Sequence, residues 1–440
     1  FSNVEKRGSL RVTNKAKGLL VAAYVLQFLP IIGGVSLYIL WLSGQGSMYL
    51  MLSGILLLAA PLITKYGLIL PLIIGERFIQ APRQRKIIAK TVDQLRQHKA
   101  IKIAIAGSYG KTTFREILFI ILSNGKRVRA TPGNYNTPLG ISRFMKSVSG
   151  DEEVLIFEFG EYYPGDIAEL CNMVQPDLGV ITGINEAHLS RFGTIDRTID
   201  TIFELEDFLQ KKPLYKNRDN ENVQKRISAD DPLAYNQSGV NGWEVKDIAL
   251  LPMSTSFVLQ KEDRHILAET GLLGKHVIGP IVAAVSIAES LGLSDAQIQQ
   301  GIAAITPYEH RMAPRIVGGA TIVDDTYNGN VDGIRAGIEY LKNVQASGRR
   351  IYVTPGLVEQ GDQTEAIHIE IGRSLAPIAD IVVLMQNSVT PFIQSGLQEG
   401  QFSGELVLID NPLDFYKNID HFVAAGDIVL MQNDWTDNYS

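Results

Sequence analysis

The chain has 440 residues, which is enough for two or three domains. Its formal net charge is −6, so no overall positive field attracts nucleic acid, and we expect no nucleic-acid partner. Cys171 is the only cysteine, which excludes internal disulfide bonds and cysteine-rich metal sites and is typical of a reducing compartment. We expect Cys171 to be a small residue of the core.

The N-terminal segment, residues 1–76, is strongly apolar. No Asp, Glu, Lys or Arg occurs between Gly18 and Thr64. Two apolar blocks, 19–42 and 48–70, are each long enough to cross the roughly 30 Å core of a bilayer, which takes about 20 helical residues. A cleaved signal peptide would have one shorter apolar region. We therefore predict a hairpin of two transmembrane helices.

Positive charges on both sides of this hairpin predict its orientation. The loop between the apolar blocks is uncharged, whereas both flanks are basic at Lys6, Arg7, Arg11, Lys15 and Lys17 and at Arg77, Arg83, Arg85, Lys86 and Lys90. The positive-inside rule then places both ends, and the domains that follow, in the cytoplasm beside the inner (cytoplasmic) membrane. Residues 77–100 are predicted as a basic juxtamembrane helix. This helix could equally contact anionic membrane lipid or serve as a solvated connection between the membrane and the next domain.

Ile101–Ile121 (IKIAIAGSYGKTTFREILFII) combines a short apolar strand, a glycine-containing loop, Lys-Thr and a helical apolar pattern. Backbone N–H groups and a helix N-terminus can surround phosphate oxygens there, while Lys111 neutralises charge and Thr112 offers a hydroxyl to Mg²⁺. The general phosphate loop has four residues between its glycines, whereas in this chain only two residues lie between Gly107 and Gly110. The flanking strand and helix nevertheless predict a nucleotide site.

From residue 101 onward, strand-like runs alternate with helical patterns, which predicts an α/β fold of parallel sheets with flanking helices. The strand-like runs are Val154–Phe159, Leu178–Thr182, Thr321–Val323, Ile351–Thr354, Ile381–Leu384 and Ile428–Met431. The helical segments are Thr113–Leu122, Gly165–Met173, Ile281–Leu291, Gly333–Lys342 and Thr364–Ala376. The highly charged stretch Asn217–Asp231 is expected to form loops or turns. A boundary near 313–319 divides this part into a central domain, 101–312, and a C-terminal domain, 313–440.

Polar residues stand where strands end, as ligand sites in open α/β sheets do. Glu158 would usually be a surface residue at a strand end, but beside a phosphate loop it is a natural Mg²⁺ ligand. His188 alone is more often structural. Asn134 and Asn136 form turns by default, yet they also offer amide donors near the loop. In Asp324–Asn328 (DDTYN), turn formation competes with ribose or substrate contacts.

Taken together, these stretches resemble the Mur ligase family, most closely its branch that adds D-alanyl-D-alanine. The resemblance runs from about Ile101 to the C-terminus and keeps the family's motif order. It is carried by GSYGKTT, GNYNTPLG, FEFGEYYPGDIAEL, VITGINEAHLSRFG, YKNRDN, GKHVIGPIVAAVSIA, EHRM, DDTYNGN and VTPGLVEQG with HIEIG. It implies a central P-loop ATPase domain of the Mur ligase type and a C-terminal Rossmann-like α/β domain, here preceded by the two transmembrane helices.

The resemblance also implies a role for particular residues. Nucleotide contacts fall on Gly107, Ser108, Gly110, Lys111, Thr112, Thr113, Asn217, Asp219, His276, Arg311 and Asp325. Catalytic roles fall on Lys111, Glu158, His188 and Arg311, Mg²⁺ binding on Thr112, Glu158 and His188, and substrate contacts on Asn134, Asn136, Tyr327 and Asn328. The implied reaction uses ATP and Mg²⁺ to form an amide bond through an acyl phosphate. It joins an amino acid or D-Ala-D-Ala to a soluble or lipid-linked cell-wall peptide precursor.

Three departures from the family pattern affect these expectations. Ile202 stands where a carbamylated lysine normally supports a second Mg²⁺. Val277 and Pro280 replace two asparagines expected after His276 on the adenine side. Only residues 77–100 lie between the hairpin and the ATP-binding domain, which leaves no room there for the family's UDP-binding domain. We therefore expect the acceptor to be held differently or to be presented from the membrane as a lipid-linked precursor.

Two other functions stay open. A poly-γ-glutamate synthase-like ligase would also join a hydrophobic N-terminus to this type of ATP domain, although DDTYNGN and the third domain favour the cell-wall branch. A non-catalytic, ATP-binding membrane scaffold would explain Ile202. The intact Lys111, Glu158 and Arg311 argue against that scaffold.

Overall fold

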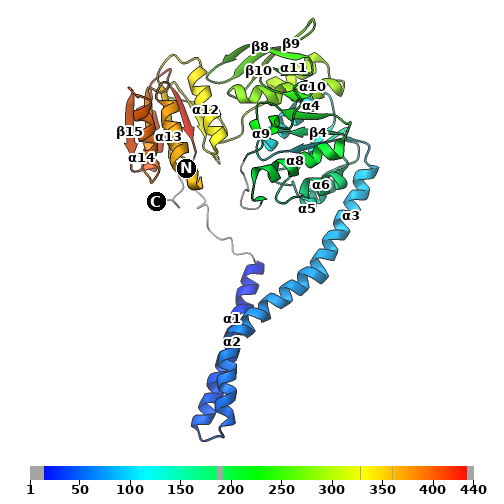
Figure 1. Cartoon of the computed structure of the whole chain (residues 1–440), viewed down its shortest axis with the longest axis vertical. Helices are drawn as coiled ribbons and strands as arrows, with labels where there is room; N and C mark the ends of the chain where they lie inside the picture. The colour runs from blue at the N-terminus through cyan, green and yellow to red at the C-terminus, as the bar shows by residue number, and fades with distance from the viewer. Residues whose placement is uncertain (1–13, 186–191, 328, 359, 434–440) are drawn as a thin grey trace. The chain divides into compact units, whose positions relative to one another are not determined.

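The computed structural model describes residues 14–185, 192–327, 329–358 and 360–433. The chain separates into two units, Phe1–Lys90 and Thr91–Ser440, whose elements are labelled in Figure 1. The division falls inside a helix, whereas the predicted boundaries lay at residues 76 and 100. Each unit is described by itself.

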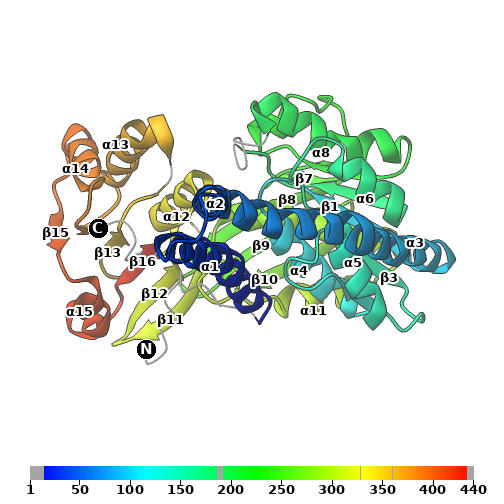
Figure 2. The ribbon, with the colours of Figure 1, turned by 90° about the horizontal axis from the view of Figure 1, so that it is seen from below.

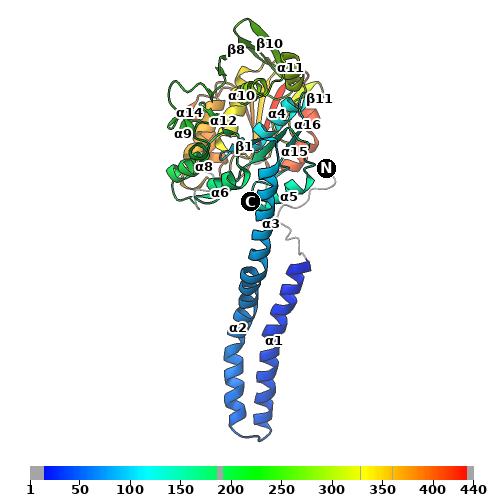
Figure 3. The ribbon, with the colours of Figure 1, turned by 90° about the vertical axis from the view of Figure 1, so that its right-hand side faces the viewer.

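The first unit is a pair of helices, α1 (Asn14–Leu42) and α2 (Met48–Gly75), which lie side by side in Figure 3. By length and composition both are apolar enough to cross a membrane. Small residues let them approach: a Cβ at Gly34 would lie 2.7 Å from the Leu57 side chain. The Ser53 hydroxyl donates to the Gly34 carbonyl at 2.7 Å. Close backbone approach and an interhelical hydrogen bond are the interactions that hold helices together in lipid.

Helix α2 continues through the π-helical turn η1 (Glu76–Gln80) into α3 (Ala81–Gln97). The predicted juxtamembrane helix of residues 77–100 is thus helical only as far as Gln97. Thr91 and Leu95 are buried, whereas the preceding positions of α3 are half-buried or exposed. The last two turns of α3 therefore pack as part of the second unit, which begins at Thr91.

The second unit opens with a six-stranded parallel sheet in the order β2-β3-β1-β4-β5-β6. Its strands are β1 (Ile101–Ala106), β2 (Val128–Ala130), β3 (Val154–Glu158), β4 (Leu178–Ile181), β5 (Leu214–Asn217) and β6 (Ala234–Tyr235). The accompanying helices are α4 (Lys111–Ser123), α5 (Pro138–Phe144), η2 (Met145–Ser147), α6 (Asp166–Val174), α8 (Ile195–Leu209), α9 (Glu221–Gln224), η3 (Lys275–Val277), α10 (Ile278–Ser290) and α11 (Asp295–Ala303). Because β1 lies between β3 and β4, the carboxyl ends of all three strands meet at one edge.

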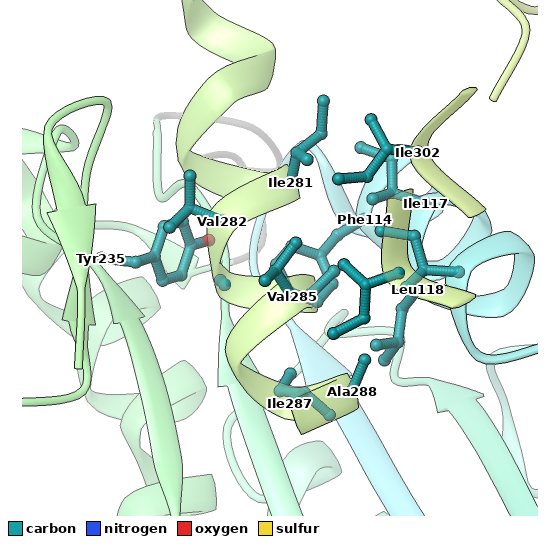
Figure 4. Packing of buried hydrophobic residues seen from close by; sticks show 14 of the residues in the cluster. Phe114, Ile117, Leu118, Tyr235, Ile281, Val282, Val285, Ile287, Ala288 and Ile302 are labelled. Atoms are coloured by element: carbon teal, nitrogen blue, oxygen red, sulfur yellow. The ribbon is translucent and has the colours of Figure 1, made fainter. Parts of the chain in front are cut away.

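The largest core lies between this sheet and helices α4, α10 and α11. Figure 4 shows Phe114 and Leu118 of α4 beside Val285 of α10 and Ile302 of α11. The Phe114 ring also packs on the Tyr235 ring of β6, with 5.9 Å between the centroids. This packing fixes α4, and with it the loop that precedes α4, against the centre of the sheet.

A four-stranded antiparallel sheet follows in the order β10-β9-β8-β7. It comprises β7 (Gly239–Val240), β8 (Trp243–Leu250), β9 (Thr255–Lys261) and β10 (Arg264–Thr270). This sheet was not predicted from the sequence. In β10 every second side chain from Ile266 to Thr270 is buried and the intervening ones are exposed, which is the pattern of a sheet with one solvated face. The buried face joins the core formed by α10 and α11.

The third sheet has the order β11-β12-β16-β13-β14-β15, with β11 antiparallel and the other strands parallel. Its strands are β11 (Ala313–Val317), β12 (Ala320–Asp325), β13 (Arg350–Thr354), β14 (Ile381–Met385), β15 (Glu405–Ile409) and β16 (Ile428–Gln432). Its helices are α12 (Val331–Asn343), η4 (Gly361–Gln363), α13 (Thr364–Leu375), α14 (Thr390–Glu399), α15 (Pro412–Lys417) and α16 (Ile419–Phe422). Figure 2 shows α13 and α14 on one side of this sheet and α15 on the other. Two separate apolar clusters fill the two interfaces.

The predicted α/β fold is confirmed. Each strand-like run lies on a strand and each helical segment on a helix, and Cys171 is buried in α6. The expectation for Asn217–Asp231 is partly wrong, because the short helix α9 lies within it. Asn220 caps that helix by accepting a hydrogen bond from the Val223 N–H at 3.0 Å.

A buried histidine makes the stability of the third sheet's domain sensitive to acid. His368 of α13 accepts a hydrogen bond from the Leu357 N–H at Nε2, at 2.9 Å. Its Nδ1 faces the Thr364 carbonyl, which requires Nδ1 to be the protonated nitrogen of a neutral ring. Burial lowers the pKa of His368. Protonation would set an Nε2 proton against the Leu357 N–H.

We predict that the free energy of unfolding falls as the pH drops below about 6.5, the usual histidine pKa, because the unfolded chain then binds a proton that the fold rejects. Thermal unfolding between pH 7.5 and 5.5 measures this. The His368→Gln variant should show a flatter pH dependence, while His265→Gln, at an exposed position, should follow the wild type. Equal pH dependence in all three proteins would contradict the prediction.

Candidate active site

Two glycines shape the loop between β1 and α4. Gly107 has φ +145°, and a Cβ there would lie 2.2 Å from the Thr182 hydroxyl that follows β4. Gly110 has φ +79° and directly precedes α4. The loop is tied to the end of β4, because the Ser108 N–H donates to the Gly183 carbonyl at 2.7 Å. The Thr182 hydroxyl in turn donates to the Tyr109 carbonyl at 2.6 Å. Only glycine allows this close approach without strain.

The loop delivers the N-terminus of α4 to the edge of the sheet. The first helical hydrogen bond runs from the Phe114 N–H to the Gly110 carbonyl at 2.9 Å. The N–H groups of Lys111, Thr112 and Thr113 therefore precede the helical ladder and carry the positive end of the helix dipole. This arrangement suits the oxygens of a phosphate group.

The ammonium of Lys111 is paired with a carboxylate that the sequence analysis did not single out. Lys111 Nζ lies 2.9 Å from Glu161 Oε2 and 3.1 Å from Glu161 Oε1, and it also donates to the Gly107 carbonyl. The Lys111 side chain is 12 % exposed and that of Glu161 is 3 % exposed. Burial raises the pKa of Glu161, and the charge of Lys111 opposes that rise. In the sequence, Glu161 stands in a turn-like GEYYPG segment, where a solvated carboxylate is the ordinary expectation.

A second buried pair involves Glu158, the last residue of β3. Glu158 Oε2 accepts hydrogen bonds from the Thr112 hydroxyl and from Arg115 Nη1, each at 3.0 Å. Arg115 is 3 % exposed, and its guanidinium also donates to the Gly133 carbonyl and to Glu116. Arg115 was not among the site residues predicted from the sequence. Its position four residues after Lys111, on the same face of the helix, was the available signal.

Thr112 and Glu158 fit a magnesium ion by the chemistry of their oxygens. Hydroxyl and carboxylate oxygens are ligands that Mg²⁺ accepts, and Mg²⁺ usually takes its remaining ligands from water and substrate. His188, the third predicted metal ligand, lies outside the described residues. Among the described residues, no group of three or more His, Cys, Asp and Glu side chains gathers. Ile202 is fully buried in α8 and brings no ligand atom.

The asparagine loop lies next to the end of β3. The Asn136 carbonyl accepts a hydrogen bond from the Gly160 N–H at 2.9 Å, and Asn136 is buried while Asn134 is exposed. A pocket of about 370 Å³ opens beside Asn136. It is lined by Thr137, Pro138, Gly160, Tyr162, Tyr163, Asp166, Glu169 and Leu170. Gly160, which lines this pocket, lies in the sequence between Glu158 and Glu161, the carboxylates of the two ion pairs.

The YKNRDN element reaches the phosphate loop through a residue that was not predicted. Asn220 Nδ2 donates to the Tyr109 hydroxyl at 3.1 Å. The predicted Asn217 instead accepts from the Asp219 N–H at 3.1 Å, and Asp219 accepts from the Gln237 N–H at 2.9 Å. Asn217 thus holds a turn within the segment, whereas Asp219 ties the segment to the chain that follows β6. His276, in η3, is exposed.

Arg311 and the candidates of the C-terminal domain make contacts with one another and with the third sheet. The Arg311 guanidinium lies over the Tyr327 ring at 4.7 Å from its centroid. Asp325 accepts hydrogen bonds from the Met312 N–H and from Gln432, and burial raises the pKa of Asp325 to about 6. Asn328 lies outside the described residues. The structure therefore gathers Lys111, Thr112 and Glu158 into one site and groups Arg311, Asp325 and Tyr327 separately.

Two parts of the chain match domains of known proteins. Residues 105–288 match the Mur ligase middle domain, and residues 310–432 match the Mur ligase glutamate ligase domain. UDP-N-acetylmuramoyl-tripeptide–D-alanyl-D-alanine ligase of Bacillus subtilis is 22 % identical over 331 residues, 75 % of this chain and 72 % of that protein. The ligase of that name from Escherichia coli is 25 % identical over 278 residues, 62 % of this chain and 61 % of its own length.

The fold comparison agrees with these matches. The crystal structure of a MurF ligase from Thermotoga maritima in complex with ADP is similar, with a TM-score of 0.66 and 26 % identity over 80 % of each chain. Both α/β domains are thus matched in chain order by domains of one family, and the resemblance predicted from the sequence is confirmed. The chain belongs to the Mur ligase family.

Proposed function

We propose that the protein is an ATP-dependent ligase that forms an amide bond on a cell-wall peptide precursor, with D-Ala-D-Ala or an amino acid as the amine. The observation that carries this proposal is the meeting of Lys111, Thr112 and Glu158 at the carboxyl ends of β1 and β3. The names of the relatives support the amine, since those ligases add D-alanyl-D-alanine. The ADP complex of the Thermotoga maritima ligase supports ATP as the second substrate.

The proposed reaction has two steps. A carboxylate oxygen of the acceptor attacks the γ-phosphorus of ATP, which gives an acyl phosphate and ADP. The amine nitrogen then attacks the acyl carbon, phosphate leaves and the nitrogen loses a proton. Because two anions must meet in the first step, catalysis depends on positioning and on neutralising charge.

The residues of the site have corresponding tasks. The N–H groups at the start of α4 and the ammonium of Lys111 bind phosphate oxygens. Thr112 and Glu158 would hold Mg²⁺, which supplies positive charge to phosphate oxygens when it is bound. Arg311 and His188 are proposed from the family resemblance for phosphate and metal contacts, and Asn134, Asn136 and Tyr327 for substrate contacts. The pocket beside Asn136 is the proposed place for part of the acceptor.

The proposal extends to the membrane. Helices α1 and α2 form a transmembrane hairpin with both ends in the cytoplasm, and the basic residues of η1 and α3 contact anionic lipid. An acceptor linked to a lipid would then meet the ligase at the membrane surface.

We predict that Lys111→Ala lowers ATP-dependent ligation by about a hundredfold or more, because it removes the cation that neutralises the phosphates. Membranes containing the protein would be supplied with ATP, D-Ala-D-Ala and mixed amino acids, and the products identified by mass spectrometry. Lys146→Ala removes an exposed lysine of the same domain and should leave the yield unchanged. Unchanged turnover in Lys111→Ala would refute the assignment of the loop. ATP binding without ligation of any amine would favour a scaffold.

The choice of acceptor can be tested separately. We expect the detergent-solubilised protein to ligate lipid-linked muramoyl peptides, because a membrane hairpin tethers the ligase domains to the bilayer that carries such acceptors. Parallel reactions with lipid-linked and soluble UDP-linked peptides, followed by mass spectrometry, measure this preference. Ligation of the soluble peptides alone would show that the hairpin does not present the acceptor.

A further inference from the structure

The pairing of Lys111 with Glu161 has a consequence for nucleotide binding. An ammonium has three N–H donors, and in this structure the Gly107 carbonyl and the two oxygens of Glu161 are within reach of them. The ammonium that the proposed function assigns to phosphate is therefore already neutralised by the protein. A phosphate group has to compete with Glu161 for it.

The negative charge of Glu161 also opposes phosphate binding directly. Glu161 is almost fully buried, and so is Glu158, which is the last residue of β3 and stands three positions earlier. Arg115 pairs with Glu158 rather than with Glu161. Once a phosphate draws Lys111 away, the Glu161 carboxylate faces that phosphate as a second anion in a place that is shielded from water. Like charges a few Å apart in such surroundings repel strongly.

We propose that Glu161 is a positioning residue, an internal counter-ion that holds Lys111 before nucleotide binds and that disfavours nucleoside phosphates carrying no divalent cation. This inference rests on the proposed function, since it assumes that the loop binds a nucleotide. A bound cation offsets the charge of the phosphates, so the penalty from Glu161 falls mainly on the metal-free nucleotide. The loop thereby prefers the form of the nucleotide that can react.

The test is ADP binding to the full chain in detergent, measured by calorimetry with EDTA and again with Mg²⁺. Glu161→Gln removes the charge but keeps an oxygen that can accept a hydrogen bond from Lys111. We expect it to bind ADP about tenfold more tightly than the wild type in EDTA, with a smaller gain in Mg²⁺. Glu262→Gln removes an exposed carboxylate of the β9–β10 turn and should bind as the wild type does in both conditions.

A merely structural ion pair predicts the opposite result, because its loss would weaken binding with and without the metal. Equal or weaker ADP binding in EDTA by Glu161→Gln would overturn the proposal. If that variant does not fold, Glu161→Ala, which also removes the charge, is held to the same expectation. A wild type that binds no ADP even with Mg²⁺ would refute the nucleotide site itself. Wild-type binding with no gain in the variant refutes only the role of Glu161.

Discussion

Two cations on α4, the largely buried Lys111 and the buried Arg115, organise the site. Lys111 and Arg115 stand one helical turn apart, and each is paired with a carboxylate at or just beyond the end of β3. A buried charge without a partner costs several kcal/mol, so helix and strand can adopt only arrangements that keep both pairs together. The pairs therefore fix the start of α4 against β3, while Gly107 packs against Thr182 and fixes it against β4. The phosphate loop is held from both sides of β1.

The residues proposed to bind the metal and the lysine proposed to bind phosphate have different partners in this structure. Thr112 and Glu158 are already in contact, so the proposed metal ligands need little movement to bind an ion. Arg115 also donates to the Gly133 carbonyl and thus ties the asparagine loop to the same helix. Lys111, by contrast, has to exchange its partner when a phosphate arrives. In the proposed function, the two residues that would hold the metal are thus already in contact, whereas the lysine that would bind phosphate is held by an internal anion.

The N-terminal hairpin changes the setting of this chemistry. Its helices pack through Gly34, which has no Cβ, and Ser53, which has a small side chain. Larger residues at these positions would prevent the close approach. The region between the apolar helices and β1 consists of the turn η1, the basic helix α3 and residues 98–100. In the proposed function, a chain of this kind works on substrates at the membrane surface, which accounts for the short connection between the hairpin and the ATP-binding domain.

Local pattern was enough to predict much of the molecule. The parallel strands, the helices between them and the loop at Gly107–Thr112 follow from hydrophobic periodicity and glycine spacing, which act over a few neighbouring residues. The antiparallel sheet of β7–β10 was missed, although the alternation in Arg264–Thr270 was present in the sequence. Its strands are half exposed, so they lack the continuous apolar runs by which the buried parallel strands were found.

The sequence by itself determined the fold class and the family and selected Lys111, Thr112 and Glu158 as candidate site residues, because these inferences depend on residue types at short spacing. Only the tertiary structure decided the partners of these residues. Glu161 and Arg115 belong to a turn-like segment and to an amphipathic helix, where charged residues are ordinarily solvated. Packing of α4 onto the sheet removes water from both, and a buried ion must then find a counter-ion from another element. The two pairs join residues that lie 50 and 43 positions apart in the sequence. No local pattern contains such a relation.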